Sequence, residues 1–206
     1  TQPIIANDRV FVASVDRHTI YALDAANGKQ LWSFVAGGRV DSSPTYHKGR
    51  LLFGAADGRV YCLDADSGEM AWRFTAAPRE RRIVAFGQLE SPWPVHGTVL
   101  IFNSLAYVVA GRSTLIDGGA HFYALEPQTG KVFHHAHVRQ GPPDLSKDIG
   151  EHFAMDGSNI DILTTDGEHI FCMQEMFDAQ LNRIEPPWNT RYGDRYLGDD
   201  HLMATG

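Results

Sequence analysis

Hydrophobic and polar residues alternate along much of the chain with the period of two that is typical of β-strands. Residues 21–24 read Tyr-Ala-Leu-Asp, and the run that follows ends at Gly28. Aspartate accepts hydrogen bonds from the backbone of a turn, and glycine adopts positive φ at no steric cost. The chain then continues with Trp32 and Phe34, which a strand places on one face. This pattern predicts a β-hairpin with two aromatic side chains on its returning strand.

The same pattern occurs three times. Its signature is an acidic residue followed four positions later by a glycine, and in two copies by a tryptophan four positions beyond that: Asp24, Gly28 and Trp32; Asp64, Gly68 and Trp72; Glu126 and Gly130. The first two copies are 40 residues apart, and the third has His134 in place of the tryptophan. Internal repeats with this period are typical of propellers, solenoids and other arrays.

A second hairpin precedes the signature in each unit. Residues 9–16 (RVFVASVD) align with residues 50–57 (RLLFGAAD), and Asp57-Gly58 is a strong signal for a two-residue hairpin turn. Asp166-Gly167, ahead of the apolar run 170–173, indicates the same turn in a fourth unit. Each unit therefore contains about four short antiparallel strands, as a propeller blade does.

We therefore predict an all-β fold made of β-propeller blades of four antiparallel strands, in a single segment. The predicted blades cover residues 1–37, 38–78, 91–140 and 155–185 of the segment 1–206, with irregular loops at 140–160 and 185–200. An open row of blades leaves strand edges unpaired, which natural proteins avoid. We expect an incomplete propeller whose remaining blades, or a protein partner, complete it.

The third unit diverges from the first two. A polar, glycine-rich insert at 111–119 predicts a surface loop. The candidate residues for binding a ligand or a partner lie in turn-rich parts of this unit: Glu90, Trp93, His96, Arg112 and Asp117. Trp93, between two prolines, could present a flat apolar face, and Arg112 could bind a carboxylate or phosphate with two hydrogen bonds. In the alternative interpretation, Trp93 fills a blade interface and Arg112 pairs with Asp117.

Four histidines raise the question of a metal site. Strand alternation places His135 and His137 on one face and His134 on the other, with His121 upstream. Two histidines on one face could bind zinc or copper only with a third ligand from elsewhere. No spacing rule for such a site is met, so we predict hydrogen-bonded or solvated histidines and no metal site. Signatures of nucleophilic and phosphate-binding enzymes, such as GxSxG and the P-loop, are absent.

Composition narrows the class of function. The net charge of −7 and the pI of about 5.7 argue against a nucleic-acid-binding surface. No apolar run reaches the ~20 residues of a transmembrane helix. The chain begins at Thr1 without an apolar leader, which indicates a processed product or a cut piece. Cys62 and Cys172 lie in separate apolar runs and form no vicinal pair, so we expect buried free thiols.

The motif Ala22-x-Asp24-x-x-x-Gly28-x-x-x-Trp32 resembles the PQQ-like repeat, also called the tryptophan-docking motif. Residues 61–72 match it with Cys62 in place of the family's alanine, and residues 123–130 match it with Glu126 in place of aspartate. Residues 90–97 and 110–113 are similar to a subgroup of large bacterial proteins with PQQ-like domains. The resemblance implies a propeller of six to eight blades in exported bacterial proteins of the periplasm or cell envelope.

The same resemblance implies two functional types. One is the quinoprotein dehydrogenase, with pyrroloquinoline quinone (PQQ) and calcium on the propeller axis and, in alcohol-oxidising members, a vicinal disulfide against the cofactor. The other is the non-catalytic scaffold of the BamB type. That disulfide cannot form here, and carboxylates such as Glu90, Asp117 and Asp161 show no diagnostic spacing. We therefore predict no cofactor, and PQQ with calcium only in the quinoprotein alternative.

The sequence thus favours a non-catalytic scaffold that binds a protein partner or the remaining blades. The first alternative is a piece of a PQQ- and calcium-dependent oxidoreductase. The second is a carbohydrate- or polymer-binding module that contacts its ligand through the Trp93 loop.

Overall fold

The computed structural model describes residues 1–114, 116–139, 162–172 and 175–184. In these ranges all helical or strand structure is β-strand. None of the described residues forms a helix long and apolar enough to span a membrane. The strands form four antiparallel sheets of four strands and one two-stranded hairpin. The predictions of an all-β fold and of four-stranded units are therefore confirmed. The predicted loops at 140–160 and 185–200 lie outside the described residues.

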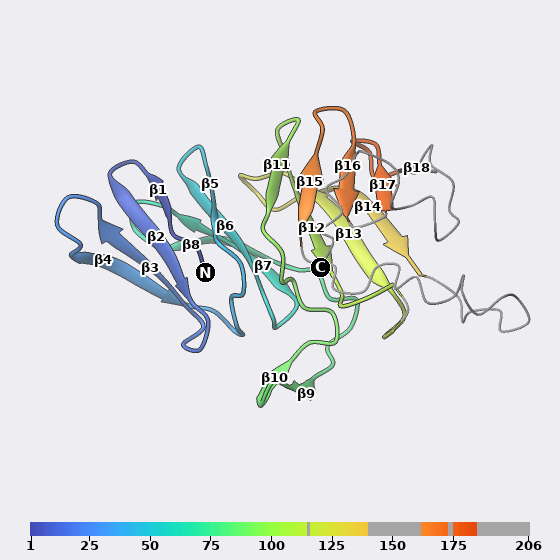
Figure 1. Ribbon diagram of the computed structural model, residues 1–206, viewed down its shortest axis with the longest axis horizontal. Coiled ribbons are helices and arrows are strands. Elements are labelled where there is room, and N and C mark those ends of the chain that lie inside the picture. The colour runs from blue at the N-terminus through green and yellow to red at the C-terminus, as the bar shows by residue number, and fades with distance from the viewer. Residues whose placement is uncertain (115, 140–161, 173–174, 185–206) are drawn as a thin grey trace, which may run out of the picture.

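The sheets follow one another in chain order, with the first and the fourth at opposite ends of the row (Figure 1). The first sheet contains β1 (Ile4–Ala6), β2 (Arg9–Ser14), β3 (Thr19–Asp24) and β4 (Gln30–Val35). The second contains β5 (Thr45–His47), β6 (Arg50–Ala55), β7 (Arg59–Asp64) and β8 (Met70–Thr75). The third contains β11 (Leu100–Phe102), β12 (Leu105–Ala110), β13 (Ala120–Leu125) and β14 (Val132–Val138). The fourth contains β15 (Leu163–Thr165), β16 (Ile170–Cys172), β17 (Glu175–Phe177) and β18 (Arg183–Ile184).

Two-residue turns join the first and second strands of the first three sheets. Both central residues have positive φ in each of these turns: Asn7 and Asp8, Lys48 and Gly49, Asn103 and Ser104. This is the backbone of a type I′ turn, whose twist matches that of the strands it joins. The tight turn fixes the register of each strand pair, for example Ala6 opposite Arg9.

The Asp-Gly turns differ from the sequence prediction. Ala55 pairs with Arg59, so the turn at Asp57-Gly58 has three residues, and Gly58 takes the left-handed position with φ +82°. Asp166-Gly167 joins the first and second strands of its sheet, whereas Asp57-Gly58 joins the second and third. The predicted equivalence of the two turns is therefore wrong, because the dipeptide signals a tight turn and not the strands that it joins.

Each signature acid organises the turn before the last strand of its sheet. Asp24 Oδ1 accepts hydrogen bonds from the backbone N–H groups of Ala26 (2.9 Å) and Asn27 (3.1 Å). The N–H of Gly28 donates to the carbonyl of Asp24, at 2.8 Å, and Gly28 has φ +73°. The second sheet repeats these bonds through Asp64, which explains the spacing of the acid and the glycine.

Among the described residues the hydrophobic core consists of three clusters, and each lies between two neighbouring sheets. Phe11 and Ile20 of the first sheet pack with Phe53 and Tyr61 of the second. A second cluster joins the second sheet to the third, and a third cluster joins the third sheet to the fourth. Because successive side chains of a strand point to opposite faces, an inner sheet can contribute to the cluster on either side.

The signature tryptophans contact the next sheet. A Cβ atom on Gly68 would lie 2.6 Å from the Trp32 ring, and Trp32 Nε1 donates to the carbonyl of Ala65 at 3.2 Å. Trp72 makes the same contacts with Gly130 (2.7 Å) and with the carbonyl of Pro127 (3.0 Å). A bare glycine at the turn therefore allows the ring of the preceding sheet to approach closely.

The junction between the third and fourth sheets is built differently. The third sheet has His134 where the first two have tryptophan. Here the hydroxyl of Tyr107, on β12, donates to the carbonyl of Ala179 at 2.7 Å. Ala179 follows Asp178, which caps its turn as Asp24 does. A hydrogen bond to the residue after the turn acid is thus kept, although a different strand supplies the donor.

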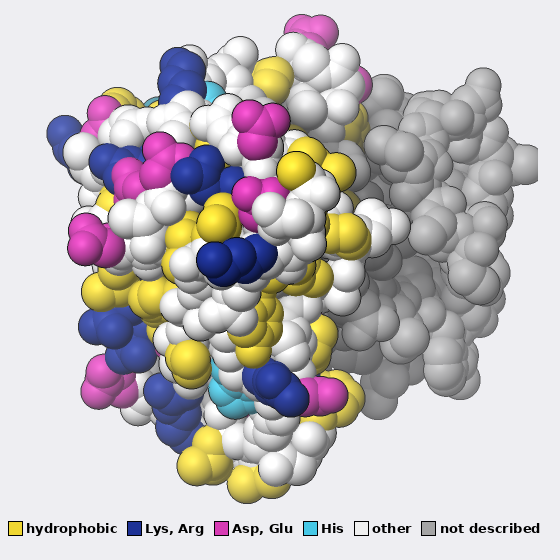
Figure 2. Space-filling view, turned by 90° about the vertical axis from the view of Figure 1, so that its left-hand side faces the viewer, with side chains coloured by type: hydrophobic (Ala, Val, Ile, Leu, Met, Phe, Trp, Pro, Cys, Tyr) yellow, Lys and Arg dark blue, Asp and Glu magenta, His cyan; other side chains and the backbone are white. Residues whose placement is uncertain are grey.

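The outer face of the first sheet is open. Ile5 is 74% exposed, Val10, Val12 and Leu23 are partly exposed, and nothing lies within 4 Å of the Cβ position on Gly28. Figure 2 looks at this side of the molecule and shows hydrophobic side chains gathered across its middle, between charged ones. The first sheet therefore carries an uncovered apolar face beside an uncovered turn.

A separate hairpin, β9 (Ile83–Ala85) and β10 (Gln88–Glu90), extends from the row between the second and third sheets (Figure 1). The Arg39 guanidinium lies 4.7 Å above the ring of Phe86 at its turn. The side chain of Gln88 lies 2.7 Å from Nε2 of His18 in the first sheet. These contacts hold the end of β10, and with it Glu90, against the body of the molecule.

Candidate functional site

Glu90 is the centre of a charged network at the end of β10. Its side chain is buried and lies between two arginines from different segments. Arg112 Nη2 donates to Glu90 Oε2 at 2.7 Å. Arg39 Nη2 lies 3.0 Å from Glu90 Oε1, an ion pair without hydrogen-bond geometry. Arg39 precedes the second sheet and Arg112 follows β12, so the carboxylate connects the second sheet to the third.

Asp41 and His96 extend this network. Arg39 donates through Nε and Nη2 to the Asp41 carboxylate, at 2.9 and 3.2 Å. His96 Nδ1 lies 2.6 Å from Asp41 Oδ2. Burial acts to raise the pKa of Asp41, but the bonds from His96 and Arg39 outweigh it and hold that pKa below its ordinary value. We call these five residues, Arg39, Asp41, Glu90, His96 and Arg112, the charged network.

The structure brings together three of the five predicted site residues: Glu90, His96 and Arg112. The other two lie elsewhere. Trp93 is only 5% exposed and belongs to the core cluster between the second and third sheets. Its ring therefore presents no open face. Asp117 Oδ1 lies 3.5 Å from Arg81 Nη1.

Two expectations about the third unit are wrong. Arg112 pairs with Glu90 and not with Asp117, because the β9–β10 hairpin brings a buried carboxylate beside it. The insert at 111–119 is not wholly a surface loop, since Ser113 and Thr114 within it are buried. Proximity in sequence suggested both expectations, and contacts across the fold replaced them.

Arg39 and Asp41 are the members that the sequence prediction missed. A signal for them exists, because Asp41 stands two residues before Ser43-Pro44 and Glu90 stands directly before Ser91-Pro92. An acid ahead of Ser-Pro therefore occurs before both the second and the third sheets. Nothing in the local pattern shows that the two acids share one arginine.

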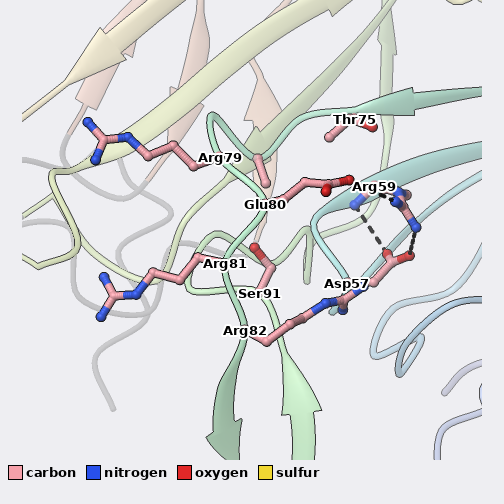
Figure 3. Close-up of a pocket in the computed structure, with 9 residues that line it drawn as sticks. Asp57, Arg59, Thr75, Arg79, Glu80, Arg81, Arg82 and Ser91 are labelled. Carbon is pink, nitrogen blue, oxygen red and sulfur yellow. Dashed lines mark hydrogen bonds and ion pairs between the residues drawn. The ribbon is translucent and has the colours of Figure 1, made fainter.

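The segment 79–82 separates two hollows in the surface, with volumes of about 280 and 350 Å³. In Figure 3 the side chains of Glu80 and Arg82 point toward Asp57 and Arg59, whereas Arg79 and Arg81 point away from them. The segment is exposed and lines both hollows.

The larger hollow is lined by basic side chains. We call it the cationic hollow and define it by Arg79, Arg81, His121, His137 and Arg139, with Trp93 and Asp117 also at its wall. Its arginines come from the segment after the second sheet and from the end of β14, and its histidines come from β13 and β14.

Three histidines form a stack beside this hollow. The ring of His121 is parallel to those of His137 and His135, with centroids 4.3 and 5.4 Å away, which confirms that His135 and His137 share a face. His137 Nε2 lies 2.7 Å from the carbonyl oxygen of Gly118. Burial, and then the proximity of His137 and His135, lowers the pKa of His121 to about 4. In the part of the chain described here, no group of three or more His, Cys, Asp or Glu is arranged to hold a metal.

The described residues do not fit a PQQ–calcium site. Calcium takes six to eight oxygen ligands, but arginines engage the carboxylates of Asp41, Glu90 and Asp117. Cys62 and Cys172 form no disulfide with each other and are buried in different core clusters, so they cannot provide a vicinal disulfide against a cofactor. Burial also raises the pKa of the Cys62 thiol to about 12. Asp161 lies outside the described residues.

The fold places the chain among repeat proteins built from β-propeller blades. Residues 2–199 match the family model described as outer membrane protein assembly factor BamB. The chain therefore belongs to this PQQ-repeat family, which confirms the resemblance seen in the sequence. No curated protein matches the chain.

Several solved structures share the fold. A quinohemoprotein alcohol dehydrogenase from Comamonas testosteroni aligns with a TM-score of 0.64 and 16% identity, over 89% of this chain and 34% of that one. The quinohemoprotein alcohol dehydrogenase ADHIIG from Pseudomonas putida HK5 gives 0.63 and 17%, over 84% and 28%. The computationally designed Ika4 protein gives 0.52 and 11%, over 88% and 86%. The chain thus spans about a third of either dehydrogenase, and the likeness shows the propeller fold alone.

Proposed function

We propose that the chain is a non-catalytic scaffold whose first blade docks a further blade. The observation that carries the proposal is the open face of the first sheet. At the next two junctions a tryptophan covers the signature glycine, Gly68 or Gly130, whereas Gly28 is uncovered. The first blade therefore has an uncovered signature glycine, Gly28, against which a tryptophan from another blade can pack.

The neighbouring blade provides a direct comparison. Val10, Val12 and Leu23 of the first sheet are partly exposed, whereas Leu51, Phe53 and Leu63 at the equivalent positions of the second are completely buried. Burial of apolar surface stabilises a contact by about 25 cal/mol per Å². The second blade packs against the first through this face. The equivalent face of the first blade is uncovered and can therefore bind a further blade.

The charged network supports a scaffold more than an active site. Its two buried or half-buried carboxylates are each held by arginine, and it connects segments that lead into different blades. Paired charges of this kind fix the geometry between blades and leave no carboxylate free as a general base. By analogy with its family, we place the protein in the bacterial periplasm or cell envelope.

A test with the cofactor separates the scaffold from its main alternative, a piece of a quinoprotein oxidoreductase. The full chain is incubated with PQQ and calcium, and the bound-quinone absorbance and the reduction of a redox dye by alcohols and sugars are measured. We expect neither a bound-quinone spectrum nor turnover. Substrate-dependent dye reduction would overturn the scaffold proposal and establish the alternative.

The carbohydrate-binding alternative relied on an exposed Trp93 ring. Because that ring is buried in the core, a sugar cannot stack on it without a rearrangement of the loop. Tryptophan fluorescence that responds to a glycan in the wild type, but not in Trp93→Phe, would restore this alternative.

A further inference from the structure

We propose that the cationic hollow binds a small organic oxyanion, recognised through its carboxylate or phosphate groups. The first argument is charge. Three arginines line the hollow against one carboxylate, Asp117, although the protein as a whole carries a net charge of −7. A concentration of positive charge in a concave part of an acidic protein attracts anions, because like charges held together gain from a shared counter-ion.

The second argument is that the side-chain donors of Arg79, Arg139 and Trp93 are not used within the described part of the fold. Asp117 engages Arg81, but in the described ranges no carboxylate lies within ion-pair distance of Arg79 or Arg139. The indole Nε1 of Trp93, at the wall of the hollow, is buried and has no acceptor among the described residues. A buried donor without a partner costs about 1–3 kcal/mol, so such groups are uncommon outside binding sites.

The third argument is geometry. Guanidinium groups bind carboxylate and phosphate with two parallel hydrogen bonds, a match that a single ammonium cannot give. Arg79 and Arg81 point to the same side of their segment, away from Asp57 and Arg59 (Figure 3). With Arg139 from the end of β14, they approach the hollow from two parts of the fold.

Size limits the ligand. The hollow has a volume of about 350 Å³, within the range of about 300–1,000 Å³ found for small-molecule sites. Its wall also includes His121 and His137, whose rings stack on each other. A small molecule with two or more anionic groups therefore fits better than a polymer chain. The proposal is independent of the scaffold role, because the hollow lies at the junction of the second and third blades and not on the open face.

The test is calorimetric titration of the full chain with citrate and, separately, with pyrophosphate at low ionic strength. Glucose serves as an uncharged control. We expect one molecule of at least one anion to bind per chain, with an affinity that falls as salt is added. The tighter of the two anions assigns the group recognised, carboxylate or phosphate. Absence of binding by both anions, or equal binding of glucose, overturns the proposal.

Variants locate the binding. Arg81→Gln and Arg139→Gln should each weaken binding about tenfold or more, because each removes a charge-assisted hydrogen bond. Arg17→Gln, an exposed arginine in the first blade, is the matched control and should have no effect. Circular dichroism checks that each variant folds, and Arg139→Lys should restore part of the affinity if Arg139→Gln is unstable. Unchanged affinity in folded Arg81→Gln and Arg139→Gln would refute the assignment to this hollow.

Discussion

At the scale of single residues, Glu90 is the position where replacing one side-chain atom should change the stability of the fold most. Its carboxylate is completely buried and faces Arg39 and Arg112. Glu90→Gln keeps the shape of the side chain but leaves Arg112 without its counter-charge and Arg39 with Asp41 alone. Breaking a buried ion pair from one side is strongly destabilising. We expect the free energy of unfolding to fall by about 2–4 kcal/mol, measured by urea denaturation.

Glu69→Gln is the matched control for this prediction. Glu69 is exposed, so the same chemical change should alter stability by less than about 0.5 kcal/mol. An equal effect of the two substitutions would mean that the charged network does not contribute to stability.

The histidine stack predicts a pH dependence. The pKa of His121 is about 4 in the folded protein, against the ordinary 6.5. The unfolded chain therefore binds more protons than the folded one between these values, and the protein loses stability as the pH falls from about 6.5 toward 4. Melting temperatures of the wild type and of His121→Phe should diverge between pH 7.5 and 5.5, with a smaller decrease in the variant. Parallel curves for the two proteins would contradict the prediction.

The sequence found part of the candidate site. Glu90, His96 and Arg112 stood out because they lie in the unit that departs from the repeat, and the structure joins them. Arg39 and Asp41 were missed because they belong to a regular unit, where the local pattern indicates only a segment that connects two sheets. The pairing of Arg112 was predicted wrongly, because sequence distance favours Asp117 whereas the hairpin delivers Glu90.

At the scale of the blades, the signature glycines have two separable roles. Gly68 has φ +75° and a tryptophan ring 2.6 Å from its Cβ position, whereas Gly28 has φ +73° and no neighbour. Gly28→Ala should cost about 1–2 kcal/mol, since an L-residue is strained in the left-handed region. Gly68→Ala should cost the same amount and about 1–3 kcal/mol more, because the methyl group displaces Trp32.

The difference between these two alanine variants, measured by denaturation of each, reports the contact between blades alone. If Gly28→Ala costs as much as Gly68→Ala, the first turn is covered in solution and the open face described above is occupied. A difference that disappears in a Trp32→Ala background would confirm that the ring causes it.

At the scale of the whole molecule, the open face of the first blade predicts association. Ile5 and Leu23 expose apolar surface that an additional blade would bury, and in its absence a second copy of the chain can use it. Light scattering should show an average mass that rises with protein concentration. The double substitution Ile5→Lys and Leu23→Lys should abolish this rise.

Val84→Lys provides the control for that experiment. Val84 is as exposed as Ile5 but lies on the β9–β10 hairpin, so the substitution should leave the association unchanged. A wild-type chain that stays monomeric at all concentrations would argue that the first face needs no occupant.

The sequence alone determined the repeated unit, its four short strands and the acid–glycine turn before the last of them. Alternation, the acid–glycine spacing and tight-turn residues act within about ten positions, and local backbone preferences are strong enough to decide them. Only the tertiary structure decided which residues meet between units. The tryptophans contact the glycine of the next blade, Glu90 reaches Arg39 and Arg112, and the hollow gathers arginines from two blades. These contacts join residues that the repeat pattern marks as equivalent or leaves unconnected. The packing of the blades against one another determines which of them meet.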